Sequence, residues 1–395
     1  MSHFVVKYTD NMTDIQVAFW NLENLFDLTS SETALIHEFT PDRGWTQEVL
    51  DKKIENLAEV IKLLNNGQGP DLFGVCEVEN EKVTQKLLDK IGRSDYRIAQ
   101  YIDGPDIRGI DTSLIYSTKV FRFVTATSRN VYLRYPTRDI FHIHLQVIDN
   151  NAELDVIVNH WPARVKGQCE TEALRITAAE GCARVVDNIL KFPLNELKTM
   201  PDNLQTDECI TSLNQRWNKN IIIMGDFNDQ PFDKSIISHL RAIPDPEPMR
   251  EWRYIFEFLK GDFMTRERLS DKENYLQQAT YLYNCMWRLI PDGTNYNDKL
   301  MNPMNLLDQF IISRGLYHGE NKLIMDLNEV KIFKEATNTP YGHNHTTIKE
   351  PDGRPMSFEW VKKDKYGKPL EIRRGKEPNS GYSDHFPIQA IIKTV

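Results

Sequence analysis

The stretch Ile221-Ile-Ile-Met-Gly-Asp-Phe-Asn-Asp229 joins an apolar run to a polar turn. Its first four residues carry no polar side chain, which predicts a short strand buried on both faces. Gly225 then permits a tight backbone turn. Asp226 and Asn228 are two residues apart and face the same side of an extended segment. A carboxylate and an amide placed there are suited to bind a ligand, although Asx side chains that cap a turn give the same pattern.

Five further polar clusters adjoin apolar runs in a similar way. Glu77 closes one run, and a carboxylate at that point is costly to bury unless it is paired or binds a metal. Asp384 and His385 are adjacent, so they could supply a metal ligand and a general base. A surface loop is the alternative for this pair, and a histidine packed beside Trp161 is the alternative for His160. The five clusters are Phe19-Trp-Asn-Leu-Glu-Asn24, Gly74-Val-Cys-Glu-Val-Glu-Asn80, Val158-Asn-His-Trp-Pro162, Leu306-Leu-Asp-Gln-Phe-Ile-Ile312 and Ser383-Asp-His-Phe-Pro387.

Short apolar runs rich in Val, Ile and Phe predict eight strands. Helical spacing of apolar residues over 45–65, with Thr46 as the N-cap, predicts a helix, and two more are predicted over 172–190 and 251–260. Because strands outnumber helices and helices lie between some of them, we expect sheets covered by helices. The predicted strands are 15–20, 72–75, 113–116, 141–148, 154–158, 221–224, 309–312 and 387–392.

Three stretches interrupt this pattern. Residues 191–218, with two prolines and a polar run, predict a connector between two halves of the molecule. Residues 242–278 and 340–380 predict insertions. The latter is rich in Gly, Pro and Lys and alternates around 356–361 and 370–373, with Lys365-Tyr-Gly-Lys368 as the turn of a hairpin. We expect one catalytic domain over residues 1–395.

Composition narrows the function classes. The net charge of the 395 residues is -9 and 40% of them are hydrophobic. The acidic balance counts against a protein that coats nucleic acid without specificity, although a local basic patch and a bound metal can offset the repulsion. The five scattered cysteines predict buried thiols rather than disulfides or a zinc site. The N-terminus lacks the layout of a secretory signal and no stretch approaches the ~20 apolar residues of a membrane span, so a cytoplasmic protein is expected.

Taken together and in this order, the clusters resemble the endonuclease/exonuclease/phosphatase superfamily. That superfamily includes pancreatic deoxyribonuclease, exonuclease III-like repair enzymes, inositol polyphosphate 5-phosphatases and neutral sphingomyelinases. The resemblance runs from Val17 to Ile388, and its most specific parts are GDFND, SDHFP and NHW. Asn-Leu-Glu-Asn-Leu-Phe at 21–26 and Arg-Gly-Ile-Asp at 108–111 resemble a less characterised microbial branch. The resemblance implies a four-layer α/β sandwich, with two mostly antiparallel sheets packed face to face between layers of helices.

The resemblance also implies roles for individual residues. A Mg²⁺ or Mn²⁺ site is implied at Glu77, Asn21 and Asp384, with Glu23 as an accessory residue, because oxygen ligands suit these hard cations. His385 would contact the scissile phosphate or activate water, and Asp308 would orient it. The remaining implied residues are Asp226 and Asn228, which position the nucleophile and stabilise the transition state, His160 as a second histidine, and Asp111, which orients His160.

Arg108, Arg164 and Arg175 lie near these motifs. Arginine binds phosphate through paired hydrogen bonds, and a solvated surface position is the alternative for each of the three. They are predicted to contact the substrate phosphate.

Two substrate classes compete. The first is nucleic acid, cut at its phosphodiester bonds; the second is a small or lipid-linked phosphate ester. The 5-phosphatase branch carries a Cys-Asp-Arg near its catalytic Asp-His, which this sequence lacks. We therefore expect a nuclease acting on DNA or RNA, with a phosphatase or phosphodiesterase as the alternative. The sequence identifies no protein partner. A catalytically inactive binding module is disfavoured, because every metal and histidine position holds a competent residue.

Overall fold

The computed structural model describes residues 13–29, 35, 39–261, 270–296, 304–337, 345–372 and 375–395. Other residues lie outside this description. They include most of the N-terminal segment judged to lack a signal layout, Arg373 of the predicted hairpin, and residues 262–269 and 340–344 of the two predicted insertions.

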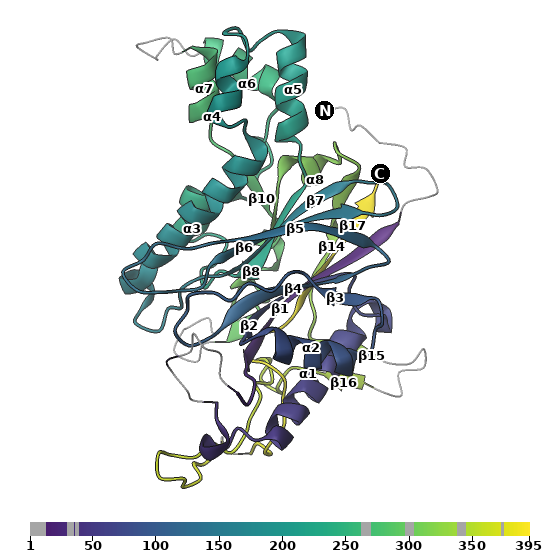
Figure 1. Cartoon of the computed structure of the whole chain (residues 1–395), viewed down its shortest axis with the longest axis vertical. Helices are drawn as coiled ribbons and strands as arrows, with labels where there is room; N and C mark the ends of the chain where they lie inside the picture. The colour runs from purple at the N-terminus through teal and green to yellow at the C-terminus, as the bar shows by residue number, and fades with distance from the viewer. Residues whose placement is uncertain are drawn as a thin grey trace.

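Two large sheets form the centre of the molecule (Figure 1). Neighbouring strands are antiparallel except in the pairs β1–β2, β7–β8 and β9–β10. The first sheet has the order β14 (Leu323–Ile332), β17 (Ile388–Thr394), β1 (Asp14–Leu25), β2 (Leu72–Val78), β4 (Asp111–Ser117), β3 (Tyr96–Ile98). The second has the order β5 (Phe121–Arg129), β6 (Ile140–Val147), β7 (Glu153–His160), β8 (Ile221–Asp226), β13 (Asp308–Ile312), β10 (Leu282–Asn284), β9 (Ala242–Ile243).

The apolar residues divide into three layers, which confirms the predicted four-layer sandwich. In β1, alternate residues point to opposite faces: Val17 and Phe19 join the layer between the sheets, together with Met224 of β8. Ala18 and Trp20 point the other way, into the layer under the helices of the first sheet. Ile221 and Ile223 of β8 likewise pack under the helices of the second sheet. Each sheet therefore buries both faces.

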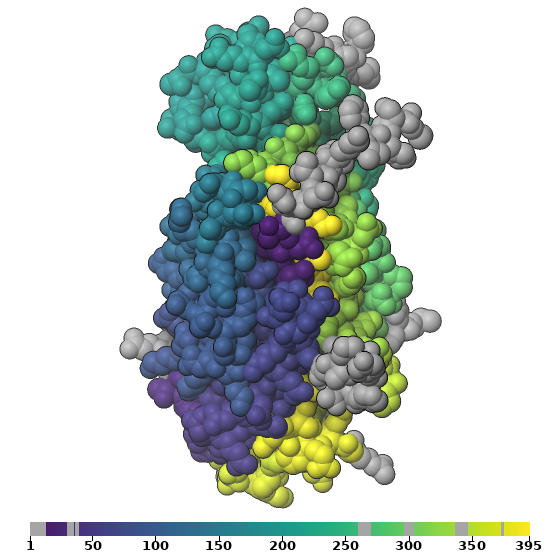
Figure 2. Space-filling view, turned by 90° about the vertical axis from the view of Figure 1, so that its right-hand side faces the viewer, coloured from purple at the N-terminus to yellow at the C-terminus, as the bar shows by residue number. Residues whose placement is uncertain are grey.

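Helices cover the outer faces of both sheets. On the first sheet lie α1 (Gln47–Gly67) and α2 (Glu81–Ile91), and on the second lies α3 (Gln168–Leu190). Beyond α3, a group of helices stands out from the sandwich at one end (Figures 1 and 2). These are α4 (Leu194–Thr199), α5 (Asp207–Trp217), α6 (Trp252–Gly261) and α7 (Asp271–Gln277). Two shorter helical elements are α8 (Arg314–His318) and a π-helical turn (Ser235–Leu240).

The start and end of α1 follow from its sequence. The side chain of Thr46 accepts a hydrogen bond from the backbone N–H of Val49, which confirms the predicted N-cap. Val49, Ile54, Leu57 and Ile61 are buried against the first sheet. The regular helix stops before residues 64–66, whose backbone angles are non-helical.

Residues 191–218 were predicted to connect two halves of the molecule, and this prediction is wrong. Residues 191–218 contain α4 and α5 and lead from α3 to β8. Since β7 and β8 are parallel neighbours in one sheet, this stretch belongs to a crossover within the second sheet and does not join two halves. Parallel neighbours require such a long connection.

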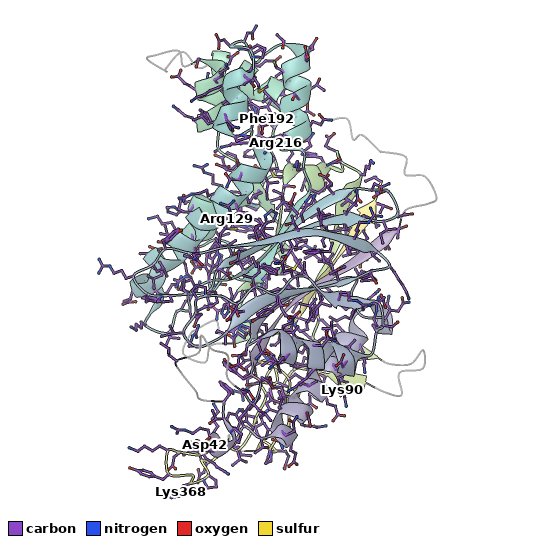
Figure 3. The ribbon with its side chains drawn as sticks, viewed as in Figure 1. Asp42, Lys90, Arg129, Phe192, Arg216 and Lys368 are labelled. Atoms are coloured by element: carbon purple, nitrogen blue, oxygen red, sulfur yellow. The ribbon has the colours of Figure 1, made fainter. Side chains whose placement is uncertain are left out.

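The predicted insertion before the last strand lies at the opposite end of the molecule from α4–α7. Its turn is confirmed: Lys363 pairs with Pro369 in a β-bridge, and Lys368 is at the tip (Figure 3). The strand runs proposed on either side are limited to isolated bridges, including Glu359 with Ser380. Nearby are the short pairs β11–β12 (Asn295–Tyr296, Met304–Asn305) and β15–β16 (Glu335–Thr337, His345–Thr347).

Four of the five cysteines are buried, as predicted, whereas Cys169 is exposed at the start of α3. Among the helices that the structure describes, none combines the length and apolar character needed to cross a bilayer.

Gly225 allows β7 and β8 to approach closely beside the candidate site. A Cβ atom there would lie 2.2 Å from the carbonyl oxygen of Asn159, which is backbone and has little freedom to move. We expect Gly225→Ala to lower the free energy of unfolding by about 1–3 kcal/mol, the usual range for overpacking. Gly181→Ala in α3 is the control, because its Cβ meets only the end of the Ile140 side chain. Urea unfolding of both variants measures the difference, and equal stability would contradict the strand-packing argument.

Candidate active site

The ends of the central strands meet at one place because of their register. In the second sheet, Asp226 at the end of β8 lies opposite His160 of β7 and opposite Asp308 of β13. In the first sheet, Asn21 of β1 pairs with Cys76 of β2, which precedes Glu77. The Nδ2 atom of Asn21 donates to Glu77 Oε1 at 3.2 Å and to Asp226 Oδ2 at 3.1 Å, and so links the two sheets.

His385 is held by Asp308. The His385 Nδ1 atom lies 2.7 Å from Asp308 Oδ2, and Nε2 lies 3.8 Å from Asp226 Oδ2. The Trp20 indole donates to the carbonyl oxygen of His385 at 2.8 Å. Ser383 Oγ donates to the carbonyl oxygen of Asn21 and accepts from the backbone N–H of His385. These bonds fix the loop before β17 onto β1.

The two histidines have opposite electrostatic surroundings. Burial alone would lower the pKa of His385, but Asp308, Asp226 and Asp384 together raise it well above the ordinary value. Burial, Arg138 and Arg108 instead hold the pKa of His160 well below the ordinary value. We infer an imidazolium at His385 and a neutral ring at His160, on either side of the same Asp226 carboxylate oxygen. The His160 Nε2 atom lies 3.8 Å from Glu77 Oε1 and 3.8 Å from Asp226 Oδ2.

Asp226 and Asn228 lie on the turn after β8. The Asp226 Oδ1 atom accepts from the backbone N–H of Asn228 at 2.9 Å, and Asn228 Nδ2 donates to the carbonyl oxygen of Trp161 at 3.0 Å. Burial raises the pKa of Asp226 to about 6, although His385 acts in the opposite direction. At neutral pH this carboxylate is therefore largely ionised, and it is a stronger base than an exposed aspartate.

Strained backbone positions gather at this site. Glu23, Asn24, Glu77 and Asn228 have φ of 52°, 61°, 60° and 50°. Among the described residues, these are four of the ten non-glycine positions with positive φ. Asparagine tolerates this left-handed region, whereas a glutamate there is rare and needs support from its surroundings. The backbone N–H of Asn24 donates to Glu77 Oε2 at 2.9 Å, so the turn at 23–24 supports the orientation of Glu77.

Glu23 is positioned differently from the other carboxylates. Its two oxygens accept hydrogen bonds from the Ser357 hydroxyl and from the backbone N–H of Phe358. Burial and Asp384 raise the pKa of Glu23 to about 7. This arrangement favours a supporting position behind the predicted metal ligands, and it connects the turn at 23–24 to the 345–372 segment.

The donor set fits a hard divalent cation. Within the described part of the chain, Asp226, Asp308 and His385 form a group whose ligand atoms all lie within 4.8 Å of one another. Asp308 and His385 already bond to each other, which leaves Glu77, Asn21 and Asp384 as the better place for a cation. The side chain of Asp384 is 50% exposed; partial desolvation and the nearby Glu77 raise its pKa, while His385 and Lys53 act in the opposite direction. Oxygen donors with excess charge suit Mg²⁺ or Mn²⁺.

Asp111 does not contact His160 in the structure. One of its oxygens accepts from the backbone N–H of Gly104 at 3.0 Å, and the other lies 2.6 Å from the Tyr101 hydroxyl. The Nδ1 atom of His160 is buried without a hydrogen-bond partner among the described residues. The prediction that Asp111 orients His160 is therefore wrong. Both Asp111 oxygens are engaged in hydrogen bonds with Tyr101 and Gly104, so this side chain fixes the 99–110 loop.

The three arginines lie in different environments. Arg175 is fully buried, with Nε 2.7 Å from Asp229 Oδ1. Arg164 bonds the carbonyl oxygen of Asn228 and the carboxylates of Asp229 and Asp233. Both therefore support the Asn228 turn from behind rather than presenting a free guanidinium. Arg108 is different, because its side chain is 43% exposed.

Two buried cations near the site were not predicted. Arg138 donates to the carbonyl oxygens of His160 and Trp161. Lys53 of α1 is buried with Nζ 3.5 Å from the carbonyl oxygen of Tyr382 and 4.8 Å from the ring centre of Phe358. Its spacing offered a signal, since Lys53 lies four residues from Val49 and four from Leu57 on the apolar face of α1. Arg138 had no comparable signal, since its partners are distant in sequence.

The first half of the chain is similar to a known protein family. The family model described as the Endonuclease/Exonuclease/phosphatase family matches residues 16–202. This match supports the endonuclease/exonuclease/phosphatase superfamily, whose members are phosphoesterases and include both nucleases and phosphatases. The superfamily is generally dependent on divalent metal ions.

Several solved structures resemble the whole chain. One is an endonuclease/exonuclease/phosphatase family protein from Bacteroides thetaiotaomicron, 13% identical over 98% of this chain and 99% of that chain, with a TM-score of 0.48. A second is D. rerio TDP2 complexed with single strand DNA product, 10% identical over 97% and 100%, with a TM-score of 0.47. A third is a B. thetaiotaomicron mannosyl-6-phosphatase, 14% identical over 96% and 99%, with a TM-score of 0.46. No curated protein sequence matches the chain.

The charge on His385 is directly testable in the metal-free protein. Asp308→Asn removes the nearest negative partner, so we expect the pKa of His385 to fall. A histidine whose folded pKa is raised stabilises the protein below its unfolded pKa of about 6.5, and this contribution is lost as pH rises through the folded pKa. The free energy of unfolding should therefore differ most between wild type and Asp308→Asn at or below about pH 6.5.

Imidazole NMR across a pH titration measures the pKa of His385, and denaturant unfolding at several pH values measures the stability difference. Asp364→Asn, in the 361–370 hairpin, is the control. The same His385 titration in wild type and Asp308→Asn would contradict the ion pair.

Proposed function

We propose that this protein is a divalent-metal-dependent hydrolase of phosphodiester bonds, and that its substrate is DNA or RNA. We further propose that residues 1–395 form one catalytic domain. The observation that carries the activity is the meeting of the Asp308–His385 pair with Asp226 and with Glu77 and Asn21 at the joint edge of two sheets. Glu77, Asn21 and Asp384 would hold the metal ion, Mg²⁺ or Mn²⁺. When bound, the ion neutralises negative charge on the substrate phosphate and polarises it.

The side chains of the proposed site divide the remaining chemistry. Asp226 accepts a proton from the attacking water, and Asn228, fixed by its bond to the Trp161 carbonyl oxygen, orients that water with its free amide oxygen. His385, charged and held by Asp308, donates a hydrogen bond to a phosphate oxygen from Nε2 and stabilises the negative charge that develops there. His160 is neutral and contributes a second contact without adding repulsion to the cation.

Residues around the proposed site, together with the net charge, bear on the choice between nucleic acid and a small phosphate ester as substrate. The absence of Cys-Asp-Arg near Asp384 and His385 disfavours inositide substrates. A net charge of -9 is the feature that favours a small-molecule or lipid-linked phosphate as the second candidate. We prefer nucleic acid, because a bound cation and a local guanidinium at Arg108 can offset the overall charge where the substrate binds.

Hydrolysis of supercoiled plasmid, single-stranded oligonucleotides and bis(p-nitrophenyl) phosphate tests this proposal. With Mg²⁺ or Mn²⁺, we expect plasmid and oligonucleotide cleavage, and none in EDTA. His385→Ala should lower kcat on the order of 10²–10⁴-fold, because a positioned proton donor is lost. His239→Ala is the matched control, since His239 is bonded to Glu180 on α3, outside the proposed site.

Each alternative has its own outcome. Undiminished cleavage in EDTA would refute the metal-dependent mechanism. Cleavage of the small ester with plasmid and oligonucleotides untouched would replace the nuclease proposal by the phosphatase or phosphodiesterase.

A further inference from the structure

An ion triad of Asp106, Arg108 and Arg138 joins two loops beside the candidate active site. Asp106 lies in the 99–110 loop and Arg138 in the 130–139 loop, and they bond at 3.1 Å with both side chains 5% exposed. Arg138 also donates to the carbonyl oxygens of His160 and Trp161, at 3.2 and 2.6 Å. The two loops are thus anchored to each other and to the end of β7.

Arg108 is the exposed member of this triad. Its Nε and Nη2 atoms bond the two oxygens of Asp106 at 3.1 and 3.0 Å, while no described residue forms a hydrogen bond or ion pair with its Nη1 atom. Asp106 carries one negative charge and is shared by two guanidinium groups, so the triad has a net charge of +1. Since Arg138 is buried, this charge reaches solvent only through Arg108.

The paired bonds to Asp106 also hold the Arg108 side chain in one orientation. A guanidinium that is already fixed loses less conformational entropy when it binds a ligand. The 99–110 loop, which carries Arg108, is itself fixed by Asp111, which accepts a hydrogen bond from the backbone N–H of Gly104. The Arg108 guanidinium is therefore preorganised to bind an anion, in a protein whose overall charge is negative.

Tyr135 lies on the second loop of the pair. Its side chain is 50% exposed, three residues before the buried Arg138. The Asp106–Arg138 pair joins the loop of Tyr135 to the loop of Arg108, and the bond from Arg138 to the His160 carbonyl oxygen places both loops beside the candidate site. An exposed aromatic ring is a stacking surface for a nucleobase.

We propose that Arg108 and Tyr135 form a subsite for the nucleotide next to the scissile bond, with Arg108 binding its phosphate and Tyr135 contacting its base. This deepens the proposed function and rests on it. The chemistry requires a substrate with a second phosphate and a base, which a polynucleotide has and a simple phosphodiester lacks. Asp106 and Arg138 are positioning residues for this subsite.

The first test compares substrates. Arg108→Gln should raise KM for an oligonucleotide about tenfold or more, because a charge-assisted pair is lost. It should leave KM for bis(p-nitrophenyl) phosphate within about twofold, since that ester has no second phosphate to lose an Arg108 contact. Arg108→Lys should recover only part of the loss, because lysine cannot make the paired bonds to Asp106. Arg122→Gln on β5, where the arginine bonds Gln146, is the matched control.

The second test measures binding without turnover. In the His385→Ala background with Mg²⁺, fluorescence anisotropy gives the affinity for a 5′-phosphorylated tetrathymidylate and for its abasic counterpart. Tyr135→Ala should weaken the thymidine oligonucleotide about fivefold or more and leave the abasic one unchanged, whereas Arg108→Gln should weaken both. Tyr366→Ala, an exposed tyrosine of the 361–370 hairpin, is the control.

The outcomes separate the subsite from the proposed function. Equal losses for oligonucleotide and small ester would place Arg108 on the scissile phosphate and overturn the subsite, and so would unchanged KM and affinity in Arg108→Gln. If wild type fails to cut nucleic acid, the nuclease proposal falls. Binding that is still lost in Arg108→Gln and Tyr135→Ala would then support a nucleotide subsite on its own.

Discussion

Repulsion among carboxylates at the joint edge of the two sheets is the constraint that shapes this molecule. Glu23, Glu77, Asp226 and Asp308 gather where the strands end, beside the half-exposed Asp384, and holding that much negative charge in a largely buried place is costly unless cations or hydrogen bonds compensate. The protein supplies compensation from three directions: His385 on the loop before β17, Lys53 from α1, and Arg138 from the 130–139 loop. Burial first, and neighbouring carboxylates second, raise the pKa values of Asp226 and Asp384 even so. A divalent cation at the proposed metal site would lower the cost of this negative charge.

The need to bring these side chains together explains why strained turns directly follow the rigid, buried strands. Strands buried on both faces fix the ends of β1, β2 and β8 in space. The side chains must then be turned toward one point, and the left-handed backbone at Glu77 and Asn228 does this. Such strain persists only where the surroundings enforce it. Here the Asn24 N–H holds Glu77, and the Arg164 and Asp229 network holds the Asn228 turn.

Most residues of the candidate site could be proposed from the sequence because the relevant signals are local. Apolar runs that end in Asp226 or Glu77 are visible without tertiary information, and eight strands were located this way. β5 was missed because its residues, Arg-Phe-Val-Thr-Ala-Thr-Ser, are largely exposed and lack a buried run. β14 was missed because a register shift between Asp326 and Lys331 interrupts its pattern. Partners such as Asp106 for Arg138, or Gly104 for Asp111, depend on loop conformation, which strand patterns do not encode.

The two histidines show how one residue type acquires two chemical states within a single pocket. His385 adjoins Asp308 and faces Asp226, so the charged form is favoured despite burial. His160 has its backbone carbonyl bonded to the Arg138 guanidinium, and that cation, with Arg108 behind it, favours the neutral form. Carboxylates therefore outweigh burial at His385, whereas burial and the guanidinium groups act in the same direction at His160. Arg138, which adds to the effect of burial on His160, also bonds Asp106, and Asp106 holds Arg108; the same ion triad therefore acts on the protonation of His160 and supplies the positive charge at the rim of the candidate site.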